Sequence, residues 1–181
     1  SIHLKKRIPI KTKLIGMHNV LNILASFAAI NAAKLNIEEF ADGLRGLASP
    51  PQRLELKTWV KQCQVIDDTY NANPDSMRAA IDVLSQFKGR KFAILGDMAE
   101  LGRYRKKLHI GLGDYAKING IDILLGYGDL IRHTVLAFGD NGYFFKNKIE
   151  LLDFLKKNLV GKETILLKGS RSMRMEEILD L

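Results

Sequence analysis

The longer, second part of the chain shows short apolar runs that alternate with stretches of helical periodicity. The runs predict strands at residues 53–60, 64–67, 91–95, 121–126, 143–145 and 164–168. Apolar residues at helical spacing predict helices at residues 74–87, 109–119, 130–138, 149–159 and from Met173 to the end. One of these helices has a typical start, with Asn73 as N-cap and Pro74 at its first position. Alternating strands and helices predict an α/β, Rossmann-like fold, a mostly parallel sheet with helices on both faces.

The first part of the chain has a different pattern. Residues 2–10 are compatible with an edge strand that ends at a proline. A helix from His18 to about Lys34 is apolar almost all round, which predicts that it packs on several sides against a larger body. A shorter helix is expected at residues 37–44. The run Ser49-Pro50-Pro51 then breaks the chain, so we expect a domain boundary between residues 1–49 and 50–181.

Length and composition are those of a globular protein. The 181 residues are 46% hydrophobic and 27% charged, enough for one good core and part of another. No apolar run reaches the roughly 18–20 residues that span a bilayer, and the first residues lack the apolar stretch of a signal peptide. We therefore expect no membrane contact and a cytoplasmic location. The single Cys63 cannot form an internal disulfide and is expected to be a small buried side chain.

The net charge of +8 favours anionic partners such as nucleotides, phosphorylated substrates or nucleic acid. The basic residues are scattered and are not interleaved with aromatic residues. This distribution favours an ordinary solvated surface over nucleic-acid binding.

In parallel sheets ligands bind at the carboxyl ends of the strands, so the loops that follow each strand are the candidates for function. The polar loop at residues 67–73 holds two carboxylates, two carboxamides, a hydroxyl and a phenol. A carboxylate there could accept hydrogen bonds from both hydroxyls of a ribose, and the carboxamides could bind an amide or carboxylate ligand. The alternative is structural, with Asp68 and Asn73 capping the turn and the helix.

Three other segments carry candidate chemistry, each with a structural alternative. Lys168-Gly169-Ser170-Arg171 follows the last strand and offers cations and close backbone approach to an anion. Asn19 and Asn22 lie one turn apart at a helix start and could contact a planar heterocycle such as adenine, or form a polar cap. The third segment contains Asp97, Glu100 and His109, which could bind a metal or exchange protons. The favoured interpretation of these residues is local capping and a surface histidine.

Four motifs in order resemble the carboxyl-terminal part of the Mur ligase family. They are Gly16-x-His18-Asn19-Val20-x-Asn22, the run from Ile66 to Met77 (IDDTYNANPDSM), the run from Leu95 to Gly102 (LGDMAELG), and Lys168-Gly169-Ser170-Arg171 with Met175-Glu176. The tyrosine-asparagine loop and the GDMAELG run most resemble the branch that adds a dipeptide rather than a single amino acid. The resemblance implies an enzyme that joins D-alanyl-D-alanine to UDP-N-acetylmuramoyl-tripeptide in peptidoglycan synthesis, using ATP, Mg²⁺ and an acyl phosphate.

The resemblance also implies roles for individual residues of this chain. ATP would be bound by five of them: His18, Asn19, Asn22, Arg53 and Asp68. Substrate would be bound by Tyr70, Asn71 and Asn73, where dipeptide and acyl phosphate meet, and by weaker candidates for the dipeptide carboxylate: Lys168, Ser170 and Arg171. Residues 1–49 would be the end of a central ATPase domain, and residues 50–181 the terminal Rossmann-like domain.

The resemblance places the phosphate-binding loop, the magnesium ligands and the UDP-binding domain before residue 1. We therefore expect no metal ligands in this chain, no ligation by the chain alone, and a monomer. A different class of function stays open, a stand-alone Rossmann-like module that binds a nucleotide without catalysis. A basic nucleic-acid-binding domain is a third, less favoured possibility.

Overall fold

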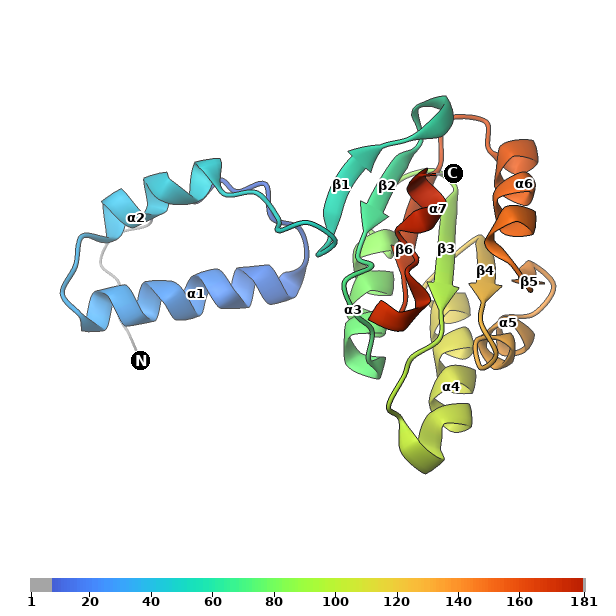
Figure 1. Ribbon diagram of the computed structural model, residues 1–181. Helices are drawn as coiled ribbons and strands as arrows, with labels where there is room; N and C mark the ends of the chain where they lie inside the picture. The colour runs from blue at the N-terminus through green and yellow to red at the C-terminus, as the bar shows by residue number, and fades with distance from the viewer. Residues whose placement is uncertain (1–7, 181) are drawn as a thin grey trace. The chain divides into compact units, whose positions relative to one another are not determined.

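The computed structural model describes residues 8–180, which divide into two compact units. The first unit is formed by residues 1–49 and the second by residues 50–181. Each unit is described by itself below (Figure 1).

The first unit contains helix α1 (Met17–Ala32), helix α2 (Ile37–Gly43) and a short 3-10 helix, η1 (Leu44–Gly46). Helix α2 begins with Asn36, whose side chain accepts hydrogen bonds from two backbone N–H groups of the first turn. The two helices meet through an edge-to-face contact between Phe27 and Phe40, whose ring centroids are 5.1 Å apart. The predicted edge strand at residues 2–10 lies mostly outside the described residues, and residues 8–10 form no strand.

Within the described residues, α1 is covered on one side and not on the several sides that its pattern predicts. Ile23 is its buried residue, whereas four large apolar residues are exposed: Met17, Val20, Leu21 and Leu24. The physical reason is that the described part of this unit offers α1 one partner helix, α2. One helix covers only one side of another, so the other sides of α1 stay exposed.

In the second unit, the described residues form one six-stranded sheet. Its strands are β1 (Glu55–Thr58), β2 (Gln64–Asp67), β3 (Lys91–Gly96), β4 (Ile123–Tyr127), β5 (Gly142–Phe145) and β6 (Thr164–Lys168). The strand order is β1-β2-β6-β3-β4-β5, and only β1 is antiparallel to its neighbour. The predicted mostly parallel, Rossmann-like sheet is therefore confirmed.

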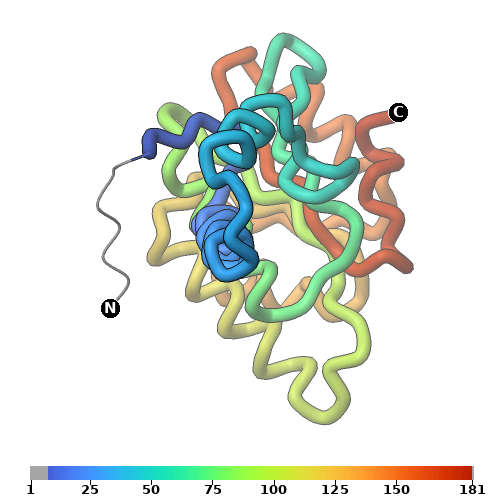
Figure 2. Tube along the Cα trace, turned by 90° about the vertical axis from the view of Figure 1, so that its left-hand side faces the viewer, coloured from blue at the N-terminus to red at the C-terminus, as the bar shows by residue number. Residues whose placement is uncertain are grey.

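Helices cover both faces of this sheet, as predicted. One face is covered by α3 (Pro74–Ser85), α4 (Arg105–Ile118) and α5 (Arg132–Phe138), and the other by α6 (Lys148–Asn158) and α7 (Glu177–Asp180). Figure 2 shows the red C-terminal segment and the yellow α4 on opposite sides of the sheet. Successive residues of the central strands point to opposite faces of the sheet, and both sets are fully buried. Ile165, for example, faces α6, and Leu166 lies on the opposite face.

Two predicted helices differ by more than two residues from their bounds in the structure. Helix α4 begins at Arg105, four residues before the predicted start, after a 3-10 turn at Gly102–Tyr104. The predicted C-terminal helix is shorter, because a 3-10 turn at Arg171–Met173 is followed by Arg174 in the left-handed region (φ 46°), which interrupts helical geometry. Helix α7 then spans only Glu177–Asp180.

The strand order brings three loops together. Strand β6 lies between β2 and β3, and its chain leaves toward α7 on one face, whereas β2 and β3 lead to α3 and α4 on the other. Neighbouring strands whose connections leave in opposite directions open a crevice at their carboxyl ends. The topology therefore places a crevice beside the end of β6.

Candidate functional site

A cavity of about 430 Å³ occupies this crevice. It is lined by three segments that each follow a parallel strand: residues 71–73 after β2, 99–101 after β3 and 170–172 after β6. Three of the predicted loops therefore meet at one place. The lining is rich in carboxamide, hydroxyl and charged side chains, so the cavity suits a small polar ligand.

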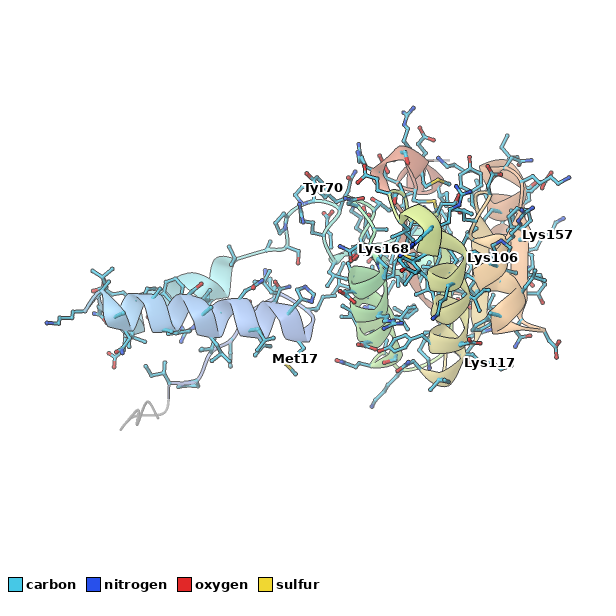
Figure 3. All side chains as sticks on the ribbon, turned by 90° about the horizontal axis from the view of Figure 1, so that it is seen from below. Met17, Tyr70, Lys106, Lys117, Lys157 and Lys168 are labelled. Atoms are coloured by element: carbon cyan, nitrogen blue, oxygen red, sulfur yellow. The ribbon has the colours of Figure 1, made fainter. Side chains whose placement is uncertain are left out.

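Lys168 holds the loop after β2 against the end of β6. Its ammonium group donates to Asp68 Oδ2 at 2.6 Å and to the backbone oxygen of Asn71 at 2.9 Å, and the residue is only 2% exposed. Burial lowers the pKa of Lys168, and the neighbouring Asp68 carboxylate acts in the opposite direction. Figure 3 shows Lys168 within the body of the second unit. Lys168 thus fixes the position of the polar loop.

Asp68 is bonded on both of its carboxylate oxygens. Oδ2 accepts from Lys168, and Oδ1 accepts from the backbone N–H of Leu54 at 3.1 Å. A carboxylate offers about four lone-pair positions, so each oxygen retains capacity for a further donor such as a ribose hydroxyl. Asp68 therefore does more than cap a turn, because it links the residues before β1, the loop after β2 and the end of β6.

The adjacent Asp67 has a separate structural role that the sequence reasoning missed. It is fully buried, its Oδ2 accepts from Lys57 Nζ at 2.6 Å, and its Oδ1 accepts from the Thr69 hydroxyl at 2.7 Å. The pattern predicted the strand that carries Lys57. It did not predict the antiparallel register that brings Glu55 opposite Asp67, and the ion pair of Lys57 with Asp67 depends on that register.

The antiparallel direction of β1 also brings the residues before it to the carboxyl edge of the sheet. The guanidinium of Arg53 stacks on the ring of Tyr70, 3.9 Å from its centroid. The backbone N–H of Tyr70 donates to the backbone oxygen of Gln52 at 3.1 Å. Tyr70 itself is 48% exposed, and Figure 3 labels its position. Arg53 and Tyr70, both predicted site residues, thus form one surface unit.

Asn71 and Asn73 line the cavity, but their side chains also have structural partners. Asn73 forms a capping box with Ser76 at the start of α3, as the sequence predicted for its N-cap. Asn71 Oδ1 accepts from the backbone N–H of Ala72 at 2.8 Å.

Ser170 is buried at the end of β6. Its hydroxyl oxygen accepts from the backbone N–H of Ala99 at 2.7 Å, and its own N–H donates to the backbone oxygen of Asp97. Ser170 thereby joins the loops after β6 and β3, two walls of the cavity.

In the structure, Asp97 and His109 have structural hydrogen-bond partners. The described residues contain no group of three or more His, Cys, Asp or Glu side chains that could hold a metal ion. The Asp97 carboxylate holds the turn that precedes α5, because it accepts from three backbone N–H groups, those of residues 129, 130 and 131.

The interpretation of His109 as a surface residue is wrong. His109 is fully buried on α4, where Nε2 accepts from the backbone N–H of Met98 and Nδ1 lies 2.8 Å from the backbone oxygen of Arg105. The side chain lies on the side of α4 that faces the loop after β3, because Met98 belongs to that loop. Its effect is to hold that loop in place.

Two glycines let the ends of β3 and β6 lie close together under Met175. A Cβ atom at Gly169 would lie 2.8 Å from Met175 Cγ and 3.1 Å from the Cα of Gly96. The buried Met175 fills the space above both glycines. The motif glycines thus have a packing role beneath the cavity.

The predicted residues of the first unit lie at the start of α1. His18 and Asn22 are exposed, and Asn19 is half-buried and donates from Nδ2 to the backbone oxygen of Ile15 at 2.8 Å. The Asn19 side chain therefore ties the first turn of α1 to the residue before its N-cap, Gly16. In the part of the chain that the structure describes, none of the helices has the length and hydropathy of a transmembrane span.

Sequence comparison finds relatives over almost all of this chain. Residues 52–171 match the family model "Mur ligase, glutamate ligase domain". The chain is 36% identical to the UDP-N-acetylmuramoyl-tripeptide--D-alanyl-D-alanine ligase of Escherichia coli (strain K12), covering 90% of this chain and 36% of that protein. The ligase of the same name from Bacillus subtilis (strain 168) is also 36% identical, covering 91% of this chain and 38% of that protein. The chain spans little more than a third of the length of these relatives.

Solved structures show the same similarity in fold. MurF from Acinetobacter baumannii superposes with a TM-score of 0.84 at 30% identity, covering 94% of this chain and 38% of that chain. The MurF ligase from Thermotoga maritima, determined in complex with ADP, gives a TM-score of 0.77 at 26% identity, covering 92% of this chain and 38% of that chain. The family model, the curated relatives and the solved structures agree, and the chain belongs to the Mur ligase family.

Proposed function

We propose that this chain is the C-terminal part of an ATP-dependent ligase that joins D-alanyl-D-alanine to UDP-N-acetylmuramoyl-tripeptide in the cytoplasm. The observation that carries the proposal is the cavity beside β6, which is lined by all three of the family-like motifs of the second unit. Two relatives named for this reaction are 36% identical over nearly the whole chain. Because the chain spans only part of those proteins, the activity is assigned to the full-length protein that contains it.

In the proposed reaction, a carboxylate oxygen of the tripeptide attacks the γ-phosphorus of ATP, giving an acyl phosphate and ADP. The free amine of the dipeptide then attacks the acyl carbon, the new C–N bond forms, the bond to phosphate breaks, and one proton is released. The chain's task is to place the dipeptide amine beside the acyl phosphate, since positioning of two reactants lowers the barrier substantially.

The cavity beside β6 is proposed as the dipeptide site. Its volume accommodates a molecule of this size, and Arg171 on its wall supplies a cation for the dipeptide carboxylate. Asn71 and Asn73 offer carboxamide groups toward the peptide bond. Ser170 and Lys168 support the walls, because their side chains are buried and bonded to neighbouring loops.

The nucleotide is proposed to lie against Asp68 and Arg53. Asp68 is held in place by Lys168 and the Leu54 N–H and keeps lone pairs for the ribose hydroxyls. Arg53 stacks on Tyr70 and keeps its donors for phosphate oxygens.

The first unit is proposed as the end of a central ATPase domain, with His18, Asn19 and Asn22 near adenine. The exposed apolar side chains of α1 support this assignment, because a helix of that kind is normally covered by a larger body. Magnesium would be held outside this chain.

The test is a ligation assay on the full-length protein with Asp68→Ala and Asn71→Ala variants. Both variants are expected to lower kcat/KM by at least about tenfold, because each removes a polar group from the proposed substrate edge. Asp180→Ala, an exposed carboxylate of α7, is the control and is expected to keep normal kcat/KM. If both site variants retain the wild-type kcat/KM, the assignment of this loop is wrong.

A further inference from the structure

Arg171 is held by two side chains, those of Glu176 and Gln52, to which the preceding sections give no role. Its Nη1 donates to Glu176 Oε1 at 2.7 Å and to Gln52 Oε1 at 3.0 Å. The two acceptors come from different parts of the chain, one beside α7 and one just after the boundary between the units. An exposed arginine has many rotamers, so two fixed acceptors on one nitrogen restrict its orientation strongly.

The way Arg171 is bonded leaves one edge of its guanidinium available. Among the described residues, both contacts are made by Nη1, and the structure gives no partner to Nε or Nη2. These two nitrogens form the side-on edge of the guanidinium, whose parallel N–H groups match the two oxygens of a carboxylate. The Arg171 side chain is 57% exposed and lies on the cavity wall, so a ligand can reach this edge.

Glu176 is unusual in its own hydrogen bonding. Its Oε2 is buried and is the buried side-chain oxygen without a hydrogen-bond partner among the described residues. A buried carboxylate oxygen without a donor is unfavourable, and replacing it with an apolar side chain would remove that penalty. The orientation of Arg171 offers a functional reason for a carboxylate at this position.

We propose that Glu176 is a positioning residue which, together with Gln52, holds the free edge of Arg171 ready for the carboxylate of the incoming dipeptide. This inference rests on the proposed function, since it takes the cavity to be the dipeptide site. It adds the chemical feature by which the site selects its ligand, namely a free C-terminal carboxylate bound side-on. Glu176 acts through Arg171 and does not touch the reacting atoms.

The experiment measures steady-state kinetics of the full-length ligase with Glu176→Gln. The variant keeps the side-chain shape but removes the negative charge, so the ion pair with Arg171 becomes a hydrogen bond from a cation to a neutral amide oxygen. We expect KM for D-alanyl-D-alanine to rise about fivefold to tenfold, with kcat and KM for ATP within about twofold of wild type. Glu177→Gln is the matched control, because Glu177 pairs with Lys148 and Arg174 instead of Arg171.

A second substrate separates positioning from a general structural effect. D-alanyl-D-alanine amide has a neutral carboxamide in place of the carboxylate, so the proposed contact with Arg171 is largely lost in the wild-type enzyme. Glu176→Gln is therefore expected to leave KM for the amide unchanged. An equal rise of KM for dipeptide and amide, or an unchanged KM for the dipeptide, would overturn the inference.

A second variant protects the test against misfolding. Gln52→Met removes the other acceptor of Arg171 from a different segment and is expected to raise KM for the dipeptide selectively as well. If neither variant changes KM while the unaltered enzyme ligates normally, only this inference fails. If the unaltered full-length protein does not ligate at all, the proposed function fails instead.

Discussion

Replacing Lys168 by methionine tests the physical basis of the site, because this single ammonium group ties the loop after β2 to the end of β6. Methionine keeps most of the apolar stem but removes the bonds to Asp68 and to the Asn71 carbonyl. Removal of one partner of a buried ion pair typically destabilises a protein by about 3–5 kcal/mol. The Asp68 side chain is 15% exposed and keeps the Leu54 N–H, so water can compensate in part. We therefore expect a loss at the lower end, about 3 kcal/mol.

Urea unfolding of this chain, followed by fluorescence of Trp59, measures that loss. Trp59 is the single tryptophan and belongs to the second unit, where its indole N–H donates to the backbone oxygen of Leu179. A loss of about 3 kcal/mol lowers the urea midpoint by at least about 1 M at the usual slopes. Lys157→Met is the control, since Lys157 is exposed on α6 (Figure 3) and its replacement should change stability by less than about 0.5 kcal/mol.

The double variant Lys168→Met with Asp68→Asn refines the prediction. It removes both charges, so it is expected to be more stable than Lys168→Met alone. An unchanged midpoint for Lys168→Met would refute the view that this ammonium group organises the loop. A double variant less stable than the single one would show that the unpaired Asp68 charge is not what destabilises Lys168→Met.

Three further predictions concern the packing and titration of the second unit. Gly113→Ala is expected to destabilise the second unit by about 1–3 kcal/mol in urea unfolding, because a Cβ atom there would lie 2.2 Å from the backbone oxygen of Thr134. Gly111→Ala on the same helix is the control. Its Cβ atom would meet nothing within 4 Å, so this variant should be neutral or stabilising. Burial alone would raise the pKa of Glu163, but hydrogen bonds from backbone N–H groups and from Cys63 lower it overall from 4.5. The stabilising contribution of the Glu163 carboxylate is therefore present above about pH 4.5 and is lost as the pH falls through the folded-state pKa of this group. The urea midpoint of unfolding should therefore depend less on pH below pH 4.5 in Glu163→Gln than in the unaltered chain. Burial and the bond to Glu163 raise the pKa of Cys63, so iodoacetamide should label this thiol at pH 8 only as the chain unfolds; rapid labelling of the folded chain would contradict the buried position.

The alternation of strands and helices was predictable from the sequence. The buried strands give short continuous apolar runs, and the helices that cover them give apolar residues at helical spacing. The start of α4 was not, since Arg105 and the two lysines after it form an exposed first turn without apolar periodicity. The break before α7 was also missed. Arg174 adopts a left-handed conformation so that Met175 can lie over Gly96 and Gly169, a tertiary contact without a local sequence signal.

The candidate site was predictable only as a set of separate loops. The residues of the polar loop and of the segment after β6 stood out because polar groups follow buried strands. That these segments meet depends on the insertion of β6 between β2 and β3, which no local pattern specifies. Lys168 and Asp68 are 100 residues apart in sequence, so their pairing, and that of Arg171 with Gln52, required the strand order.

The activity proposed for the full-length protein that contains this chain is that of a dipeptide-adding ligase. The most direct measurement is mass spectrometry of the product formed by that protein from UDP-N-acetylmuramoyl-tripeptide, ATP and D-alanyl-D-alanine. We predict a UDP-linked pentapeptide formed in equal amounts with ADP and phosphate, and no ligation by the 181-residue chain alone. Nucleotide binding by the full-length protein without any ligated product would contradict the proposed activity and would favour a nucleotide-binding module without catalysis.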